Sequence, residues 1–514
     1  RWMNNLVPLS LGAWLFVSCY LGSLLLIGWI AKKARTENTM RDFYLAGHGF
    51  GTLMLFMTLF ATQYSGNTFF AFTGATYRIG YAWIVSLHFM TAVIVVYLLF
   101  APKLHLLAKK NGFLTPGDYI NNRYTNKLLV LLVTLVMVAV LANFLLAQLM
   151  AMGRAMQGLN PESGATSYNV GVIILALIML AYGTLGGMRA VVWTDALQGG
   201  VLMIGFAFLI VMLFDRFGSL EKATQMLMHV DLTTGSRKVL VPSADQCRQW
   251  LSYILAVGFG ICLYPQAIQR IYAASSLKTL KRSMTLMAFM PIPTMLISLI
   301  AGIMALAYLP GLEGASSDQI FGQVLREVQL HSALGNMLVV VILSAILAAM
   351  MSTADSALLS LSSMLTKDVF AKLFPHSLSE EELTRLGKAL SCLMLFFLVV
   401  LAITLKDKSS LVQLLDRKLD MLLQLVPAFI LGINWKKLDG RAVMAGLIVG
   451  VTLALIMAFG NLSFVTNGKV FGFHPGIIAL GPNLGVTILL SLWFNGKRKL
   501  VKNNYDFSVK RKVS

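Results

Sequence analysis

The chain has 514 residues, of which 57% are hydrophobic and only 12% are charged. Soluble proteins of this size carry about 25% charged residues, so the composition excludes a soluble globular protein and indicates an integral membrane protein. The formal net charge of +20 invites a nucleic-acid-binding interpretation. The positions of the basic residues argue against it.

Thirteen mostly apolar segments recur along the chain, and each is long enough to cross a bilayer about 30 Å thick. They predict an all-α integral membrane protein with 13 transmembrane helices. In chain order the predicted spans cover about residues 7–31, 50–76, 79–101, 128–152, 168–187, 192–214, 250–271, 284–309, 334–366, 387–405, 410–433, 441–460 and 473–494.

The basic residues are concentrated on alternate connections between these spans. About two thirds of the 42 lysines and arginines lie after spans one, three, five, seven, nine and eleven, or in the tail at 495–514. Cytoplasmic loops carry such an excess of basic residues. The pattern predicts a plasma (inner) membrane protein with its N-terminus outside and its C-terminus in the cytoplasm. It explains the net charge without nucleic acid, and it predicts that the tail contacts membrane lipids.

The second span contains the polar run Thr62-Gln63-Tyr64-Ser65-Gly66-Asn67-Thr68. Glycine and asparagine favour non-helical backbone, which occurs at membrane depth only where it is buried in protein or lines a cavity. The seventh span is interrupted by Gly258-Phe259-Gly260 and Pro265. Two interrupted spans five apart predict two inverted five-span repeats, although glycines for close helix packing are an alternative for the seventh span.

The ninth span carries Ser352, Thr353 and Asp355 inside an apolar segment. An ionisable group at that depth costs roughly 3 kcal/mol, so it needs a partner or a functional role. Hydroxyl, carboxylate and carbonyl oxygens suit a hard cation such as Na+. Alternatively, the hydroxyls bond to carbonyls one turn earlier and bend the helix.

Several motifs, in order along almost the whole chain, resemble those of the sodium:solute symporter family, which includes proline, pantothenate, sialic acid and galactose symporters. They are Asp42-Phe43-Tyr44-Leu45-Ala46-Gly47, the broken second span, Trp193-Thr194-Asp195-Ala196-Leu197-Gln198, Gln269-Arg270 and Met351-Ser352-Thr353-Ala354-Asp355-Ser356. The resemblance implies a leucine-transporter-like fold with discontinuous helices in spans two and seven.

The resemblance also divides the chain into parts. Residues 1–49 would form a peripheral first helix and a cytoplasmic loop. Residues 50–435 would form the transporter core, with inverted repeats at about 50–214 and 250–433. Two trailing helices at 436–494 and a basic cytoplasmic tail at 495–514 would follow.

Carried over by position, the resemblance implies a sodium site made of five neutral oxygens. Three are the backbone carbonyls of Ala61, Tyr64 and Ala349, and two are the hydroxyls of Ser352 and Thr353. Neutral ligands would hold Na+ weakly enough to release it into the cytoplasm.

A second ion site would use Asp195, Asp355 and Ser356. Two neighbouring acids repel each other unless a cation lies between them or one is protonated. A second Na+, a shared proton and structural hydrogen bonding therefore all stay open.

The resemblance places the substrate after the break in span two and on the outer halves of spans seven and eleven. The residues concerned are Gln63, Ser65, Gly66, Asn67, Thr68, Phe259, Lys418 and Gln424. A cation beside the pocket suits a carboxylate, so Lys418 predicts an anionic or zwitterionic substrate. Alternatively, Arg417 and Lys418 extend to the outer interface and pair with Asp416 and Asp420.

We therefore expect a sodium-coupled secondary active symporter that imports a small organic carboxylate or amino acid by alternating access, with Na+ as the coupling ion. One alternative is a transporter-fold sensor or receptor for a small solute, and another is a proline-type symporter specific for an amino acid. The four cysteines and seven histidines are scattered without metal-ligand spacing. We expect no catalytic residues, no nucleic-acid partner and no obligate protein partner.

Overall fold

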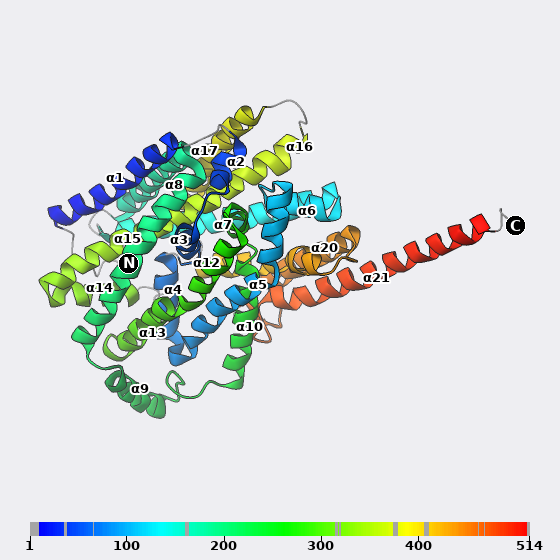
Figure 1. The fold of residues 1–514 in the computed structure, drawn as a ribbon. Helices are drawn as coiled ribbons and strands as arrows, with labels where there is room; N and C mark the ends of the chain where they lie inside the picture. The colour runs from blue at the N-terminus through cyan, green and yellow to red at the C-terminus, as the bar shows by residue number, and fades with distance from the viewer. Residues whose placement is uncertain are drawn as a thin grey trace.

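The structure is a computed structural model. It describes residues 10–34, 39–64, 66–159, 164–313, 317, 320–373, 379–405, 411–460, 462–466 and 468–510. These residues form long helices packed side by side (Figure 1). One short antiparallel hairpin, β1 (Val465–Thr466) with β2 (Lys469–Val470), lies between the last two long helices.

The described residues from 11 to 217 contain the first eight α-helices. They are α1 (Leu11–Lys33), α2 (Met40–Leu45), α3 (Thr52–Gln63), α4 (Gly66–Ile79), α5 (Val85–Asn111), α6 (Pro116–Tyr124), α7 (Lys127–Leu159) and α8 (Gly164–Phe217).

The described residues from 220 onward add helices of very different lengths. They are α9 (Leu220–Thr234), α10 (Ala244–Ile261), α11 (Pro265–Ala273), α12 (Leu277–Phe289), α13 (Pro291–Tyr308), α14 (Ile320–His331), α15 (Ala333–Met364), α16 (Ala371–Leu373), α17 (Glu380–Thr404), α18 (Leu411–Leu423), α19 (Gly432–Asn434), α20 (Gly440–Phe459) and α21 (Pro475–Lys510). Two π-helical turns, Leu365–Phe370 and Pro427–Leu431, follow α15 and α18.

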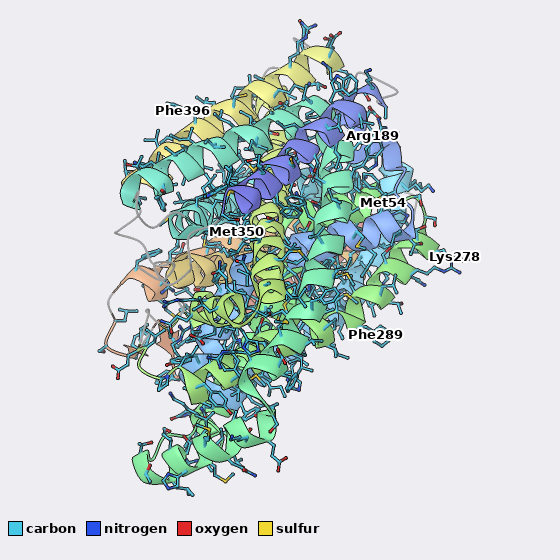
Figure 2. The ribbon with its side chains drawn as sticks, turned by 90° about the vertical axis from the view of Figure 1, so that its left-hand side faces the viewer. Met54, Arg189, Lys278, Phe289, Met350 and Phe396 are labelled. Atoms are coloured by element: carbon cyan, nitrogen blue, oxygen red, sulfur yellow. The ribbon has the colours of Figure 1, made fainter. Side chains whose placement is uncertain are left out.

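Within the described residues, nine helical segments are long and apolar enough to cross a membrane, or ten if a bent helix pair counts as one span. The chain is therefore a multi-pass membrane protein. Large apolar side chains such as Phe289 and Phe396 are 61% and 70% exposed and point outward, as Figure 2 shows. A surface of this kind suits contact with lipid rather than water.

This count is lower than the predicted 13, partly because some neighbouring spans follow one another without a loop and are counted together, and partly because no segment at 410–433 is among those counted. The predicted fifth and sixth spans, at 168–187 and 192–214, both lie in the 54-residue segment α8, and they meet at Gly187, where φ 59° and ψ −146° interrupt the helical backbone. The long helices α4 and α5 are likewise joined through the 3-10 turn Gly80–Ile84 without an intervening loop.

The backbone leaves the helical conformation inside the second predicted span. Helix α3 ends at Gln63, and Tyr64 follows with φ −108° and ψ 92° before α4 begins at Gly66. In the seventh predicted span, α10 and α11 are bent by 53° at a break of a few residues, where Pro265 starts the new helix. The predicted interruption at Gly258-Phe259-Gly260 is wrong, because these residues lie inside α10. Gly258 and Gly260 instead allow close packing against Ala92 and Leu419, which was the alternative.

Helix α15 is the most buried of the membrane-length segments, whereas α1 is mostly exposed and packs along α8. The packing partners of α15 include α7, α8 and α3. The polar residues of α15 therefore lie at the centre of the protein, where a broken helix can meet them.

Candidate functional site

The first element of the site is a helix end that frees a backbone carbonyl. Because α3 stops at Gln63, the carbonyl of Ala61 lies in its last turn, where carbonyls are no longer satisfied by the regular helix pattern. The hydroxyl of Thr353, on α15, lies 3.2 Å from this carbonyl oxygen and 2.8 Å from that of Ala349. The Thr353 hydroxyl thus lies near the carbonyls of two other predicted sodium ligands. Its bond to Ala349, one turn earlier on α15, is also the bond that the helix-bending alternative predicts.

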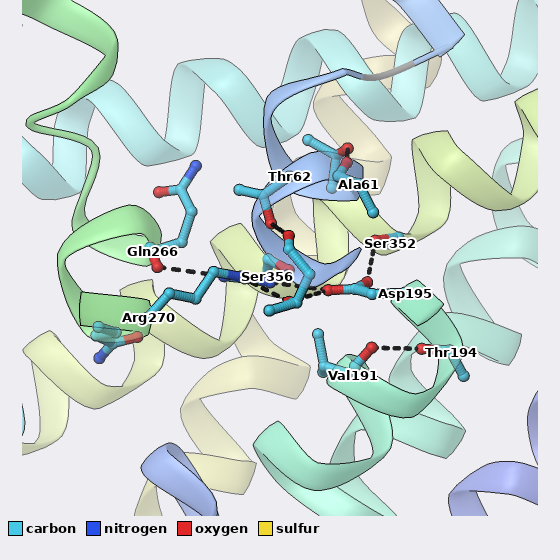
Figure 3. Close-up of polar contacts among 12 residues, drawn as sticks. Ala61, Thr62, Val191, Thr194, Asp195, Gln266, Arg270, Ser352 and Ser356 are labelled. Atoms are coloured by element: carbon cyan, nitrogen blue, oxygen red, sulfur yellow. Dashed lines mark hydrogen bonds and ion pairs between the residues drawn. The ribbon is translucent and has the colours of Figure 1, made fainter. Parts of the chain in front are cut away.

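The other two predicted sodium ligands, Tyr64 and Ser352, lie close in sequence to Ala61 and Thr353. Tyr64 marks the break itself, and its side chain is completely buried. Ser352 is also completely buried, but its hydroxyl donates a hydrogen bond to the carboxylate of Asp195 (Figure 3). In this conformation Ser352 therefore connects the predicted sodium site to Asp195.

A buried ion pair between Arg270 and Asp195 lies beside the predicted sodium site. Both side chains are 0% exposed, and Nη2 of Arg270 is 3.0 Å from Oδ2 of Asp195 (Figure 3). Nε of Arg270 donates to the hydroxyl of Thr58 over 2.7 Å, and Nη2 donates to that of Ser356 over 2.6 Å. Thr58 in turn donates to the carboxylate of Asp195. Buried charges persist when they are paired and hydrogen-bonded in this way.

This network separates the residues of the predicted second ion site. Asp195 and Ser356 share Arg270, whereas the Asp355 side chain faces Gly183 of α8. Among the described residues, Oδ2 of Asp355 has no hydrogen-bond partner. The Arg270 guanidinium therefore already supplies a positive charge to Asp195, which is the role that a second cation would have.

A cavity of about 270 Å³ opens next to the helix break and contains the predicted substrate residues Gln63 and Lys418. Its walls come from the end of α3, from α4, α5, α7 and α10, and from α18. The lining residues are Thr62, Gln63, Ala71, Phe72, Ala75, Arg78, Ile79, Trp83, Phe89, Met90, Phe144, Gln148, Gln249, Tyr253, Val257, Ile261, Tyr264, Lys418 and Leu419. The size and the mixture of aromatic and polar groups are typical of a small-molecule site.

Lys418 is 7% exposed, and its Nζ lies 4.1 Å from the ring centre of Phe144 and 5.4 Å from that of Tyr264. The structure therefore directs this side chain into the protein. The neighbouring Arg417 follows the alternative interpretation instead, since its guanidinium pairs with Asp420 at 3.2 Å.

Buried polar atoms on the cavity wall are available for a ligand. Among the described residues, Nε2 of Gln63, both amide atoms of Gln148, the hydroxyl of Tyr264 and Nε1 of Trp83 have no hydrogen-bond partner. Buried polar groups in folded proteins are nearly always hydrogen-bonded. A bound solute or water would satisfy these.

Two predicted substrate residues lie elsewhere. The amide of Gln424 donates to the carbonyls of Asp420 and Gly476 and accepts a hydrogen bond from Asn483, so it fixes α18 against α21 and does not line the cavity. Gln424 lies one turn beyond the cavity-lining part of α18. Phe259 is also absent from the wall, whereas Val257 and Ile261 on the same helix line it.

The predicted substrate residues at the break are only partly visible. Ser65 lies outside the described residues, and of Gly66, Asn67 and Thr68 only the helical backbone is described. No contact of these side chains is therefore assigned.

The sequence did not predict most of the aromatic residues that line the cavity. It also did not predict that Arg270 and Asp195 form an ion pair. Gln148 gave a usable signal, because an amide is costly inside the apolar fourth span. Trp83, Phe144, Tyr253 and Tyr264 gave none, since aromatic residues are equally frequent in helix packing and at membrane interfaces.

A multi-pass helical protein with a central cavity, a helix broken beside it and converging carbonyl and hydroxyl oxygens has the architecture of a secondary transporter. The family model described as sodium:solute symporter family matches residues 43–450. The chain belongs to this family. It is a sodium-coupled symporter with Na+ as the coupling ion, and not an enzyme.

Individual relatives share about a quarter of their residues with this chain over most of its length. The sodium/pantothenate symporter of Escherichia coli (strain K12) is 25% identical over 454 residues, which are 87% of this chain and 89% of that protein. An osmoregulated proline transporter of Bacillus subtilis is 26% identical over 470 residues, covering 89% and 91%.

Solved structures support the same fold. A substrate-bound, outward-open sodium-coupled sialic acid symporter superposes with a TM-score of 0.75 at 19% identity, covering 94% of this chain and 97% of that one. The crystal structure of MhsT in complex with L-phenylalanine gives a TM-score of 0.53 at 14% identity, covering 85% of this chain and 98% of that one.

Proposed function

We propose that the solute carried with Na+ is a small organic anion whose carboxylate binds Lys418. The observation that carries this proposal is the charge of the cavity wall. The wall includes the cations Lys418 and Arg78, and no aspartate or glutamate occurs among the described residues that line it. A desolvated cation favours an anionic ligand, and a charge-assisted hydrogen bond fixes its orientation.

The partnerless polar atoms around Lys418 support the same proposal. Gln63, Gln148 and Tyr264 would bind hydroxyl, amide or further carboxylate groups of the solute, while Trp83, Phe89 and Phe144 would enclose its apolar part. A zwitterionic amino acid is the second candidate, because relatives include proline transporters. It would need an acceptor for its ammonium group, which only neutral oxygens offer among the described residues of this wall.

The test is sodium-driven uptake into proteoliposomes with a panel of carboxylates, neutral amides and amino acids that includes pantothenate and proline. Lys418→Gln should weaken apparent affinity for the transported carboxylate by roughly 10- to 150-fold, because a hydrogen bond to a charged group contributes about 1.5–3 kcal/mol. Arg417→Gln is the matched control, since it removes a positive charge one residue away that pairs with Asp420. A preferred solute without a carboxylate, or equal effects of the two variants, would refute the proposal.

For the ion, we propose a site formed by the carbonyls of Ala61, Tyr64 and Ala349 and the hydroxyls of Ser352 and Thr353. The convergence of Ala61, Ala349 and Thr353 supports it. Ser352 would join when its hydroxyl turns from Asp195 to Na+. Ion binding would then loosen one hydrogen bond of the Arg270 network and link sodium occupancy to the contact between α11 and α8.

We also propose the finer architecture that the sequence predicts. Thirteen spans would comprise a peripheral first helix at 1–49, a core at 50–435 made of two inverted repeats with interrupted helices, two trailing helices at 436–494 and a basic tail at 495–514. The N-terminus would lie outside the plasma (inner) membrane and the C-terminus in the cytoplasm. The breaks after Gln63 and between α10 and α11, and the marginal position of α1, support this arrangement.

A further inference from the structure

A second cavity, of about 650 Å³, shares no lining residue with the cavity of the solute site. It is bordered by the end of α6, the first turn of α7, the connection from α19 to α20, and Asn495 of α21. Helices α6, α20 and α21 lie on the same side of the molecule (Figure 1). We propose that this cavity binds the phosphate-bearing headgroup of an anionic phospholipid. The inference goes beyond the transport function and does not depend on the solute.

The first argument is charge. Five basic residues line the cavity, Arg123, Lys127, Lys436, Lys437 and Arg441, against the single acid Asp439 among its described lining residues, and Arg441 pairs with that acid at 3.3 Å. Lys127, Lys436, Lys437 and Arg441 are exposed to solvent. Basic pockets between membrane helices bind anionic headgroups.

Arg123 and Asp439 fix the backbone that surrounds the cavity through hydrogen bonds. The Arg123 guanidinium donates to the carbonyls of Gly432, Trp435 and Lys436 over 2.8, 2.9 and 3.2 Å, which fixes the connection that carries the two lysines. Asp439 is the N-cap of α20 and accepts a hydrogen bond from the backbone N–H of Arg441 over 3.0 Å. The Asp439 carboxylate is therefore hydrogen-bonded within the protein, and the backbone that carries Lys436 and Lys437 is held in place.

The second argument is the direction of the helices. The 33-residue helix α7 and the 20-residue helix α20 both begin at this cavity. Helix N-termini carry partial positive charge and N–H groups without helical partners, which favour phosphate. Asn126 and Asp439 cap these two ends by accepting hydrogen bonds from the N–H groups of Leu129 and Arg441. The contribution of the ends is therefore the partial positive charge of the two helix dipoles.

The third argument distinguishes a lipid from a soluble phosphate. Leu128 on the first turn of α7, and Leu492 and Trp493 less than one turn before Asn495, are 53%, 55% and 52% exposed. Apolar surface beside a cationic cavity suits acyl chains attached to the headgroup. All three chain segments at the cavity also belong to connections predicted to be cytoplasmic, where anionic lipids lie.

The experiment measures lipid binding to the full-length purified transporter by native mass spectrometry, with thermal unfolding as a second readout. The probes are phosphatidylglycerol, phosphatidylcholine and soluble glycerol phosphate. The test variant is K127Q/K436Q/K437Q. The matched control is K278Q/K281Q/R282Q, which removes three exposed basic residues from α12; Lys278 extends into solvent in Figure 2.

Phosphatidylglycerol should bind more tightly than phosphatidylcholine and raise the unfolding temperature. The test variant should lose about five-fold in affinity per lysine, or roughly 100-fold in all, and the control should keep the wild-type affinity. K127R/K436R/K437R should restore binding and excludes misfolding as the cause. Equal losses in test and control variants, equal binding of the two lipids, or equal stabilisation by glycerol phosphate would each overturn the proposal.

Discussion

Arg270 and Asp195 are the two residues whose roles the structure defines most sharply. Each neutralises the other in a completely buried setting, and Thr58, Ser352 and Ser356 complete the hydrogen bonds. A buried charge without its partner is costly, so neither residue tolerates loss of the other. The pair therefore holds α8, α11 and α15 together beside the proposed ion site.

We predict that Asp195→Asn destabilises the protein by about 3–5 kcal/mol, because it leaves the Arg270 guanidinium buried without a counter-charge. The free energy of unfolding in detergent is the measurement. The double variant with Arg270→Gln should recover part of the loss, with a coupling energy of about 0.5–3 kcal/mol. Asp355→Asn is the control and should act additively with Asp195→Asn. Strong coupling between the two acids, without coupling to Arg270, would instead favour a shared second ion.

We predict that Thr353→Ala raises the sodium concentration needed for half-maximal uptake several-fold. The substitution removes the hydroxyl that lies between the carbonyls of Ala61 and Ala349, while Thr353→Ser keeps it and should stay close to wild type. Sodium-dependent uptake into proteoliposomes at a fixed solute concentration is the measurement. An unchanged sodium dependence of Thr353→Ala would remove α15 from the proposed site.

At the scale of the helix, the kink in α8 depends on Gly187. Its φ of 59° and ψ of −146° lie in a region that residues with a side chain rarely adopt, and an added Cβ would overlap the backbone oxygen of Phe43. The kink lets one helix run along both α1 and α15. It also brings the motif around Asp42 against α8, where Arg189 pairs with Asp42 at 2.9 Å.

We predict that Gly187→Ala destabilises the protein by at least about 1–3 kcal/mol, the usual cost of a strained backbone conformation. Gly200→Ala on the same helix is the matched control, since an added Cβ at Gly200 would have no described atom of another residue within 4 Å. Because Gly200 is in regular helix, its substitution should be neutral or stabilising by up to about 1 kcal/mol. Thermal unfolding of the two variants side by side decides the matter, and similar melting temperatures would contradict this account of the kink.

The helices could be predicted from the sequence because hydropathy depends on neighbouring residues alone. Helix α3 ends at Gln63, where serine, glycine and asparagine interrupt an apolar run and thereby indicate a break. The boundary between the fifth and sixth spans was predicted at 187–192, and the backbone leaves the helical conformation at Gly187. The short contact between Gly187 and Phe43 could not be predicted, because Phe43 is distant in sequence.

The candidate site was predictable only where its residues are close in sequence or carried by a motif. The contact of Thr353 with Ala61 joins two such motifs. The partner of Asp195 was predicted as Asp355, whereas Arg270, 75 residues away in sequence, lies within hydrogen-bonding distance in the fold. Gln424 was misplaced because the trailing helix α21 offers it partners that no local pattern reveals.

For the whole molecule, the excess of lysine and arginine on alternate connections predicts the orientation of the protein in the membrane. The three segments around the basic cavity, at 123–128, 436–441 and 495, come from connections that the bias assigns to the cytoplasm, and the fold brings them to one place. The N-terminal turn of α10 lies at the other end of its span by the same assignment. Labelling one residue at each end of this span, Cys247 and a cysteine placed at position 278, therefore tests the orientation.

We predict that Cys247, which is exposed near the start of α10, reacts with a membrane-impermeant maleimide added to intact cells. The test variant is C19S/C262S/C392S, which leaves Cys247 as the only cysteine of the four in the sequence. A second variant removes all four and adds Lys278→Cys on α12, where the side chain is exposed on the predicted cytoplasmic side. Its thiol should react only after the cells are opened. Sodium-driven uptake by both variants checks that the fold is intact. The reverse labelling pattern would place the basic connections outside, and the phospholipid cavity would then face the outer leaflet.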